Sequence, residues 1–286
     1  MRRTVTAFGL ALAVAALAAA PAGAMGKPRV AALQVGLQAK GLYAGTIDGR
    51  YGPATERAVR RLQRRAGLSV DGVFGPATRD ALGRYGRHDF GSRILRNGRV
   101  GWDVSILQFR MAWLGFPSGT LDGAFGPQTT AAVVRFQRHA GLLADGLPGP
   151  ATYRALTRAP ATVPIALGRP VRGTLVDGFG PRGNRFHTGL DYAAPTGRAV
   201  RAAAPGVVVS AGWDAGGYGK LVVVRHARRV HTWYAHLNGF RVRRGQAVAA
   251  GQRLGSVGAT GTATGPHLHF EARRRGAALD PLPAIR

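Results

Sequence analysis

Two short stretches of this sequence carry the residue types that bind a metal ion. One is Thr264-Gly-Pro-His267-Leu-His269 near the C-terminus, and the other is His187-Thr-Gly-Leu-Asp191. Successive side chains of a β-strand point to opposite faces, so His267 and His269 are expected to point the same way. His187 and Asp191 can likewise share a face of an extended segment. Three nitrogen or oxygen ligands with one open position are typical of catalytic zinc, whereas structural zinc sites are commonly closed by thiolates, and this chain has no cysteine.

A histidine pair alone is weak evidence, but a third motif lies between these two. Trp233-Tyr-Ala-His236-Leu237 follows the first motif and precedes the last. The ordered set of His-x-x-x-Asp, Tyr-x-His-Leu and Gly-Pro-His-x-His resembles the lysostaphin-type zinc metallopeptidases. The resemblance extends over residues 171–283 and includes Gly178-Phe-Gly-Pro-Arg182 before the first motif.

The resemblance implies which residues bind zinc and which assist catalysis. His187, Asp191 and His269 are the expected ligands of one zinc ion per chain. His236 and His267 are the expected catalytic histidines, because a neutral imidazole beside the water that zinc activates can take up its proton. The pattern leaves open which of the two is the general base and which stabilises the oxyanion or protonates the leaving amine.

Two further residues are candidates for contact with the substrate. The family carries an asparagine near the metal cleft just before the first ligand, which points to Asn184. Tyr234 is the other candidate, since strand alternation predicts that it shares a face with His236, although packing or orientation would also explain it. Glu271 lies two residues after His269. It is expected either to support His269 by a hydrogen bond or to be simply the next polar residue on the same face.

The C-terminal part of the sequence is rich in short β-strand patterns. From residue 171, helical spacing gives way to β-branched runs broken by glycine. The expected strands cover residues 199–202, 206–211, 221–225, 231–236, 246–249 and 267–272. Because no helical segment separates them, we expect a mostly antiparallel sheet, which agrees with the β-sheet fold that the resemblance implies.

The N-terminal half contains a tandem duplication. Residues 46–82 realign with residues 120–156, and more than half of the aligned positions are identical. A D-G-x-[FY]-G-P-x-T turn occurs twice in each copy, and only the last one departs from it, with Pro148 in the aromatic position. Asp-Gly predicts a tight turn with glycine at positive φ, and Gly-Pro followed by threonine predicts a helix start.

Each copy is expected to form a unit of three helices. Apolar residues at helical spacing mark a middle helix, with Gly67 and Gly141 as its C-caps. The other expected helices cover residues 30–39, 76–82, 104–112 and 150–156. These units resemble the peptidoglycan-binding domains of bacterial wall hydrolases, which implies that they anchor a catalytic domain to the cell wall.

The chain is thus expected to be multidomain, with two small all-α modules followed by a mostly antiparallel β-sheet peptidase domain. Residues 1–24 have a basic start, an apolar run and an Ala-Gly-Ala ending, which predict a secretory signal peptide cleaved after Ala24, exported by the general or the twin-arginine route. The modules are expected at residues 25–83 and 104–157, with an arginine-rich connector at 84–103. A proline-containing linker at 158–170 leads to the peptidase domain at 171–286. We therefore expect a secreted or periplasmic, wall-associated protein.

The chain is strongly basic, with a formal charge of +27. Without cysteine, its small domains must be held by packing rather than by disulfides. Such a charge favours polyanions, and for an exported protein the anionic polymers of the envelope are better candidates than nucleic acid. We expect peptidoglycan as the main partner, anionic envelope polymers as further ones, no nucleic acid, and a monomer.

The motifs predict an exported zinc endopeptidase that hydrolyses peptide cross-links or stem peptides of peptidoglycan. The alternative is a catalytically inactive relative that binds the wall or activates another hydrolase; such members commonly lose metal ligands, and this chain keeps all the expected ones. A protein that only binds polyanions would explain the charge but not the ordered motifs. The bias towards alanine, arginine and glycine is typical of high-GC bacteria, many of which cross-link their stems directly, and this favours a stem or D,D-type bond.

Overall fold

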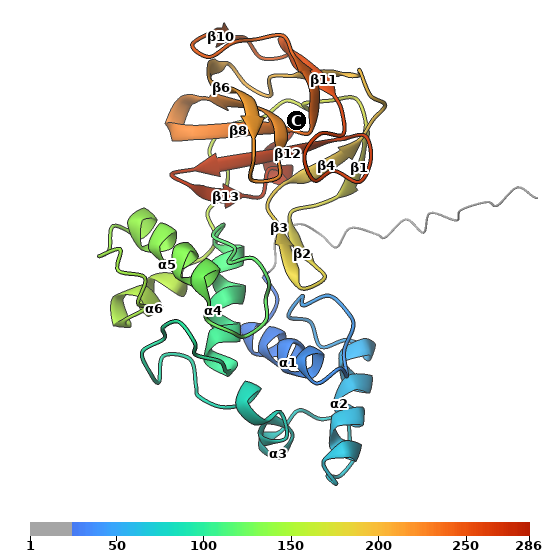
Figure 1. Cartoon of the computed structure of the whole chain (residues 1–286), viewed down its shortest axis with the longest axis vertical. Coiled ribbons are helices and arrows are strands. Elements are labelled where there is room, and N and C mark those ends of the chain that lie inside the picture. The colour runs from blue at the N-terminus through green and yellow to red at the C-terminus, as the bar shows by residue number, and fades with distance from the viewer. Residues whose placement is uncertain (1–24) are drawn as a thin grey trace, which may run out of the picture.

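The computed structural model describes residues 25–286, with a helical N-terminal part and a C-terminal sheet domain stacked end to end (Figure 1). This arrangement confirms the predicted fold class. The expected signal peptide lies outside the described residues. No helix within them combines the length and the apolar character needed to cross a membrane.

The helical part contains two copies of one three-helix arrangement. The first copy comprises α1 (Pro28–Ala39), α2 (Pro53–Arg65) and α3 (Pro76–Asp80), and the second α4 (Trp102–Trp113), α5 (Pro127–Ala140) and α6 (Pro150–Leu156). Helices α2, α3, α5 and α6 each begin at the proline of a Gly-Pro pair, where the missing N–H costs no hydrogen bond. Gly141 caps α5 at a φ of 70°, as predicted, whereas α2 is capped by Ala66 and Gly67 follows it.

A buried glutamine holds each of the four Asp-Gly turns, which the turn motif alone does not reveal. The Gln108 amide donates to Asp122 Oδ1 at 2.9 Å and to the Ala124 carbonyl at 3.0 Å, while its oxygen accepts from the Gly123 N–H at 2.9 Å. The same contacts recur at Gln34, Gln63 and Gln137. Gly123 has a φ of 70°, so the predicted positive φ is confirmed there. One glutamine-and-turn unit is therefore used four times.

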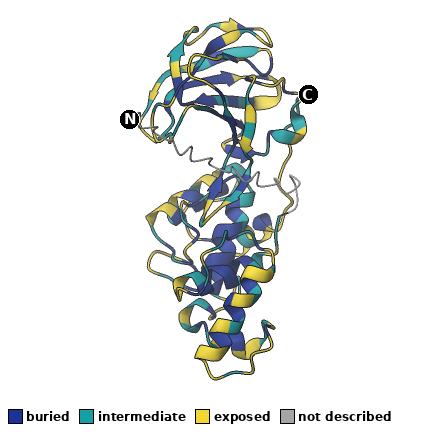
Figure 2. Ribbon diagram, turned by 90° about the vertical axis from the view of Figure 1, so that its right-hand side faces the viewer, coloured by how far each residue is buried: buried dark blue, intermediate teal, exposed yellow. Residues whose placement is uncertain are grey.

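The two copies are not independent, because α1 and α4 pack against each other at the centre of the helical part. Helix α1 is buried at every position from Ala31 to Leu37, and most of α4 is buried as well (Figure 2). A helix buried all round must form the core of a larger unit. Accordingly, Trp102 and Ile106 of α4 belong to the hydrophobic core of the first copy.

The sheet domain is built from antiparallel ladders. Its large sheet has the order β1-β4-β12-β8-β7-β6-β10, with β13 paired to β12, and a smaller sheet has the order β5-β11-β9. The strands are β1 (Thr174–Asp177), β4 (Leu190–Ala193), β5 (Ala199–Arg201), β6 (Gly206–Asp214), β7 (Gly219–Arg225), β8 (Val230–Ala235), β9 (Leu237–Phe240), β10 (Ala247–Val248), β11 (Arg253–Val257), β12 (His267–Arg274) and β13 (Ala277–Leu279). All six predicted strands are confirmed, while the remaining ones are too short or too rich in glycine to give an alternation pattern.

The segment expected to be a linker is partly built into the sheet domain. Leu167 is only 1% exposed, lies in the core of this domain, and donates its N–H to the Ala284 carbonyl at 2.8 Å. The packed structure of the sheet domain thus takes in residues before 171. The reason is that the C-terminal segment of the chain folds back to pair with this stretch.

The helical part is docked onto the sheet domain through a continuous apolar contact. Ala277 and Leu279 of β13 belong to the same buried cluster as side chains of α4, α5 and α6. The Ala278 N–H donates to the Gly115 carbonyl at 3.1 Å. A side chain at Gly115 would place its Cβ 2.2 Å from the Ala278 oxygen, so only glycine permits this approach.

A second contact is made by the hairpin of β2 (Gly180–Arg182) and β3 (Arg185–His187), which projects towards the helices in Figure 1. The N–H of Ile47 donates to the Gly183 carbonyl at 2.8 Å, and the N–H of Leu121 donates to the Asn184 carbonyl at 2.7 Å. Ile47 and Leu121 are equivalent residues of the duplication, each directly before an Asp-Gly pair. The two copies therefore hold consecutive carbonyls at the tip of one hairpin.

We expect the substitution Gln108→Ala to lower the free energy of unfolding by about 3 kcal/mol, because it leaves the buried Gly123 N–H and its neighbours without partners. Urea denaturation followed by the helical circular dichroism signal would measure this change. The matched substitution Gln128→Ala truncates an exposed glutamine of α5 and should change stability by less than about 0.5 kcal/mol. Equal effects of the two substitutions would contradict the role of the buried glutamine.

Candidate metal centre

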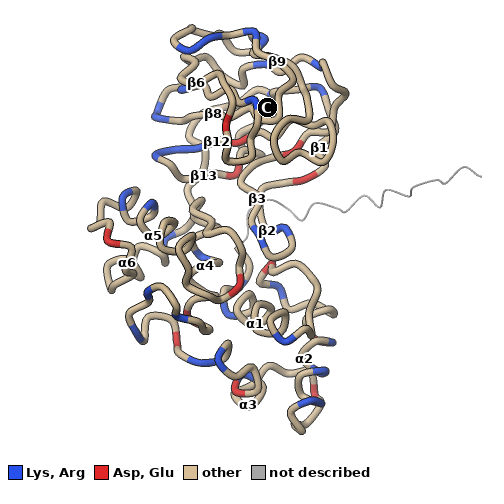
Figure 3. Tube along the Cα trace, in the orientation of Figure 1, with Lys and Arg blue, Asp and Glu red and all other residues tan. Residues whose placement is uncertain are grey.

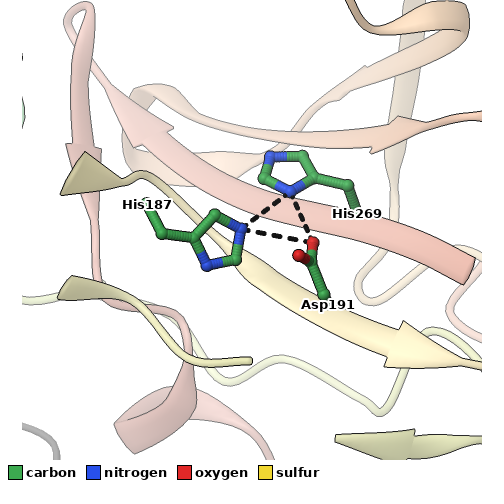
Figure 4. Close-up of side chains that lie close together, drawn as sticks. All are labelled: His187, Asp191 and His269. Atoms are coloured by element: carbon green, nitrogen blue, oxygen red, sulfur yellow. Dashed lines mark hydrogen bonds and ion pairs between the residues drawn. The ribbon is translucent and has the colours of Figure 1, made fainter. Parts of the chain in front are cut away.

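Strand pairing brings the residues of the first and last motifs together. Strands β4 and β12 are neighbours in the large sheet, and their register sets His269 opposite Asp191. His187 ends β3 just before β4 begins, and Figure 4 shows the three side chains converging. The core residues of β12 are Leu268 and its alternate neighbours, which leaves the His269 face for the cluster.

The three side chains place one ligand atom each within reach of a single ion. His187 Nε2 lies 3.0 Å from His269 Nδ1 and 3.2 Å from Asp191 Oδ1, and the last two atoms are 2.8 Å apart. A tetrahedral zinc ion with bonds of about 2.0–2.1 Å needs ligand atoms about 3.3 Å apart, so the residues fit zinc with only a small outward adjustment. Within residues 25–286 this is the one group of three potential metal ligands.

Hydrogen bonds to the outer ring nitrogens define which atoms face the ion. His187 Nδ1 lies 2.7 Å from the Gly178 carbonyl and must donate its proton there, which leaves Nε2 available to a metal ion. His269 is turned the other way, because its Nε2 lies 2.9 Å from a carboxylate oxygen of Glu271. Its Nδ1 is therefore the atom available to a metal ion. Such outer partners orient metal ligands and raise their basicity.

Asp191 is held in place through its second oxygen. Arg182 donates to Asp191 Oδ2 at 2.6 Å and also forms an ion pair with Asp177. Burial opposes the negative charge on Asp191, but hydrogen bonds with His187 and His269 hold the pKa of this carboxyl far below its usual range. Asp191 is thus an ionised carboxylate whose Oδ1 is directed at the two histidines.

Glu271 lies fully buried behind His269. Besides the histidine, its Oε1 accepts hydrogen bonds from the hydroxyls of Thr188 at 2.6 Å and Tyr218 at 2.8 Å, and Arg273 pairs with the other oxygen.

Burial alone would raise the pKa of Glu271, but Arg273 and His269 hold it below its usual range. Burial also opposes a charge on His269, yet its two carboxylate partners raise the pKa of the ring to about 9. Of these residues, sequence reasoning missed Thr188, Tyr218 and Arg273; only Arg273 gave a signal, as the next same-face residue of the strand.

His236 and His267 lie beside this triangle. Their ring centres are 4.7 Å apart, and His267 Nε2 is 3.8 Å from Asp191 Oδ1. Each ring has its Nδ1 within 2.8 Å of a backbone carbonyl, Thr260 for His236 and Gly265 for His267. Each therefore keeps Nε2 as a free acceptor. Burial lowers the pKa of His236.

Tyr234 is not placed where the alternation predicted, and we withdraw it as a substrate contact. It is fully buried, packs against Phe270 in the core, and its hydroxyl is hydrogen-bonded to Thr232 and to the Ala203 N–H. The predicted shared face fails because β8 ends at Ala235 and His236 adopts a left-handed φ of 58°, which turns its ring away from the regular alternation.

Asn184 lies at the tip of the β2–β3 hairpin, three residues before His187. Three residues of extended chain separate the two Cα atoms by about 10 Å. Its backbone carbonyl is used to hold Leu121 of the second helical copy. Its side chain is half-buried and is not part of the hydrogen-bonded cluster around the three ligand candidates.

Comparison with known protein families agrees with this architecture. Residues 185–281 match "Peptidase family M23", and residues 26–82 and 101–156 each match "Putative peptidoglycan binding domain". The C-terminal domain is a peptidase family M23 domain. It follows two peptidoglycan-binding modules, so the resemblance inferred from the motifs is confirmed.

Individual relatives of the M23 domain differ in their named roles. The DD-carboxypeptidase/endopeptidase Mpg of Neisseria meningitidis serogroup B is 52% identical over 98 residues, which cover 34% of this chain and 22% of that protein. The murein hydrolase activator NlpD of Salmonella dublin is 39% identical over 124 residues, covering 42% of this chain and 32% of NlpD. The catalytic domain of lysostaphin from Staphylococcus simulans is 34% identical, with a TM-score of 0.37, and covers 39% of this chain and 90% of that domain. The match spans about a fifth of the length of the Neisseria protein.

We expect the substitution His269→Ala to abolish zinc binding while the fold remains intact, because it removes one corner of the ligand triangle. Metal content after dialysis against trace zinc, measured by plasma mass spectrometry, should fall from one equivalent to none. The control His231→Ala removes a histidine of β8 that lies outside the cluster and should retain one equivalent. Retention of zinc by the His269→Ala protein would refute the ligand assignment.

Proposed function

We propose that this chain is a zinc-dependent endopeptidase that hydrolyses peptide bonds of peptidoglycan, with one zinc ion bound by His187, Asp191 and His269. The observation that carries the proposal is the ligand triangle with two further histidines at its side. Structural zinc sites are closed by four protein ligands, whereas hydrolytic sites keep one position open for water or substrate. A set of three ligands beside two rings with free acceptors fits the hydrolytic type.

His236 and His267 are the proposed catalytic residues. A bound zinc ion supplies Lewis acidity, which polarises the scissile carbonyl and eases the loss of a proton from water. Because both rings donate from Nδ1 to backbone carbonyls, both keep Nε2 as an acceptor, and a neutral imidazole can take up the proton there. The same ring, once protonated, can stabilise the oxyanion or protonate the leaving amine. Both histidines donate from Nδ1 and keep Nε2 as the acceptor, so either one fits either role.

The site fits a peptide substrate of the wall because the domain is joined to two peptidoglycan-binding modules. Binding to the insoluble polymer raises the effective concentration of cleavable bonds near the M23 domain. A D,D bond of the stem peptides or their cross-links is the favoured target, in line with the name of the Neisseria relative. Asn184 stays a proposed substrate contact, at the hairpin that borders the cluster.

Export and the choice of partners complete the proposal. We infer that residues 1–24 are a signal peptide cleaved after Ala24 and that the mature protein is a secreted or periplasmic monomer associated with the wall. The proposed domains are the modules at 25–83 and 104–157 and a peptidase that extends the predicted 171–286 to take in Leu167. Lysine and arginine are spread over both parts of the chain and outnumber acidic residues (Figure 3), which favours additional binding to anionic envelope polymers and not to nucleic acid in that compartment.

A second candidate function is that of an activator of another wall hydrolase. It is supported by the relative named murein hydrolase activator NlpD. The complete ligand triangle favours catalysis, since a protein that only binds the wall needs neither the metal ligands nor the two histidines. Digestion of the wall separates the two candidates.

We expect the mature protein to release soluble fragments with new amine termini from purified peptidoglycan. A chelator should stop the release, and added zinc should restore it, because the proposed chemistry needs the ion. Mass spectrometry of the fragments would identify the bond. Zinc binding and sedimentation with walls, but no release from any wall tested, would instead support the activator.

We expect His236→Ala and His267→Ala each to lower the turnover of peptidoglycan by about 10²–10⁴-fold while one zinc ion remains bound, because these residues move protons and are not ligands. Turnover and metal content measured on the same samples would separate the two effects. The control His231→Ala should keep both the turnover and the bound zinc ion. Loss of zinc from either variant would show that the histidine in question acts as a ligand.

A further inference from the structure

A cavity of about 540 Å³ lies between the second peptidoglycan-binding module and the M23 domain. One wall is the C-terminal part of α5 with Arg135, Arg138 and His139, and the other is formed by Arg229 and by Arg275 with its neighbour Gly276. Arg229 lies in the turn between β7 and β8, and Arg275 in the turn between β12 and β13. Phe116 adds an apolar surface. Both domains thus contribute cationic side chains to one cavity.

The two walls are fixed relative to each other. The cavity adjoins the contact in which Ala277 and Leu279 are buried among the helices and Ala278 is hydrogen-bonded to Gly115. His139 Nδ1 lies 3.1 Å from the Arg275 carbonyl and ties α5 directly to the β12–β13 turn. The cavity is therefore preformed, which lowers the entropy cost of binding a ligand.

The arginines of the cavity have no acidic partners. Among residues 25–286, none of Arg135, Arg138, Arg229 and Arg275 forms an ion pair, although other arginines of the chain do. Arg135 is exposed, and the pKa of its guanidinium is lowered by partial desolvation and, to a smaller extent, by the nearby Arg273. An anion bound here would relieve the repulsion between these arginines. Several guanidinium groups could donate bidentate hydrogen bonds to it.

The backbone is strained at the same place. Arg228 and Arg229 have φ values of 55° and 59°, and Arg275 has a φ of 51°. A left-handed conformation costs an ordinary side chain about 1–2 kcal/mol, and glycine would remove that cost. Of the other non-glycine residues in this conformation within the described chain, His236 lies at the metal centre and His88 in the connector. Arginine occupies three strained positions in these two turns, and two of them, Arg229 and Arg275, line the cavity opposite α5.

The cavity continues towards the metal centre. Arg135 also lines a second cavity of about 390 Å³, together with Arg185, Thr188, Tyr218 and Arg273. Thr188 and Tyr218 are hydrogen-bonded to Glu271, the partner of His269. Positive charge thus extends from the interdomain cavity to the rim of the ligand cluster. From His269 to Arg275, the first residue after β12, six residue steps of extended chain span about 20 Å.

We propose that the interdomain cavity binds free carboxylate groups of peptidoglycan stem peptides, on a stem adjacent to the one held at the metal centre. The inference rests on the proposed function for its substrate class. A distance of about 20 Å exceeds the reach of one short stem whose scissile bond lies at the metal, so the carboxylate belongs to a neighbouring stem of the same polymer. Binding there would set the direction in which the wall polymer crosses the M23 domain.

The test measures binding of a disaccharide tripeptide with free stem carboxylates to the mature chain by titration calorimetry. This probe has neither a cross-link nor a D,D bond. The double substitution Arg138→Gln/Arg229→Gln removes one guanidinium from each wall of the cavity, and we expect it to weaken binding about tenfold or more. Amidation of the probe's carboxylates should weaken binding to the unchanged protein similarly and have a smaller effect on the double variant, in which only Arg135 and Arg275 remain in the cavity.

A matched control removes the same charge elsewhere. Arg57→Gln/Arg244→Gln also takes one exposed arginine from a module helix and one from the M23 domain, and it should leave affinity within about twofold. Equal losses in the two double variants, or equal binding of free and amidated probes, would overturn the proposal. Competition by a glycerol phosphate polymer without any effect of amidation would also overturn it, in favour of a phosphate site. If the protein binds the probe through its carboxylates but fails to digest walls, the proposed peptidase activity is contradicted. The assignment of carboxylates as ligands of the cavity would still hold.

Discussion

The metal centre depends on one imidazole that is fixed at both of its nitrogens. His269 Nδ1 lies 2.8 Å from Asp191 and its Nε2 lies 2.9 Å from Glu271, so the ring can neither flip nor rotate without losing a bond to a buried carboxylate. Strand β12 makes this possible because it lies between β4 and β8 in the large sheet. β4 supplies Asp191 across the ladder, while Glu271 comes from β12 itself, two residues along on the same face. The central strand therefore carries both the proposed ligand His269 and the group that orients it.

The position of Glu271 explains the partly buried arginine beside it. A fully buried carboxylate without a partner would be strongly disfavoured, and its proton would then be retained. Arg273, on the same face two residues further on, forms an ion pair with it, and its guanidinium also stacks on the Trp233 ring at 4.1 Å. His269, Glu271 and Arg273 thus form a line of alternating hydrogen-bonding groups along one face of β12. The regular period of the strand is what makes this line continuous.

The same period explains what could be predicted from the sequence and what could not. Alternation correctly set His267, His269 and Glu271 on one face of a strand, and helical spacing with Gly-Pro starts located the helices of both modules. Alternation failed at Tyr234, because the strand stops one residue before His236 and a left-handed backbone redirects that ring. A switch of one residue from the extended to the left-handed backbone conformation cannot be recognised from the pattern of residue types.

Contacts between distant segments were also beyond prediction, for a related reason. Gly115, Ala277 and Leu279 form the docking surface between the modules and the M23 domain, yet small and aliphatic residues of this kind occur throughout the chain. Likewise, the buried glutamines were visible in the helices, but their bonds to Asp-Gly turns depend on how each helix lies against its turn. The spacing of residues in the sequence indicates where helices and strands lie and which of their faces are buried. Which other segment packs against a buried face depends on the tertiary packing.

The duplication acquires a structural meaning from the hairpin that both modules hold. Ile47 and Leu121 use the same backbone N–H, one in each copy, to bind consecutive carbonyls at Gly183 and Asn184. The hairpin leads from this tip directly to His187 on one side and to Arg182, the partner of Asp191, on the other. A single module could hold only one of the two carbonyls and would leave the hairpin free to pivot about it. Two equivalent turns fix its direction, so the modules support two of the three residues that are proposed to bind zinc. In this chain the wall-binding part and the metal centre are mechanically one structure, not a catalytic domain on a loose tether.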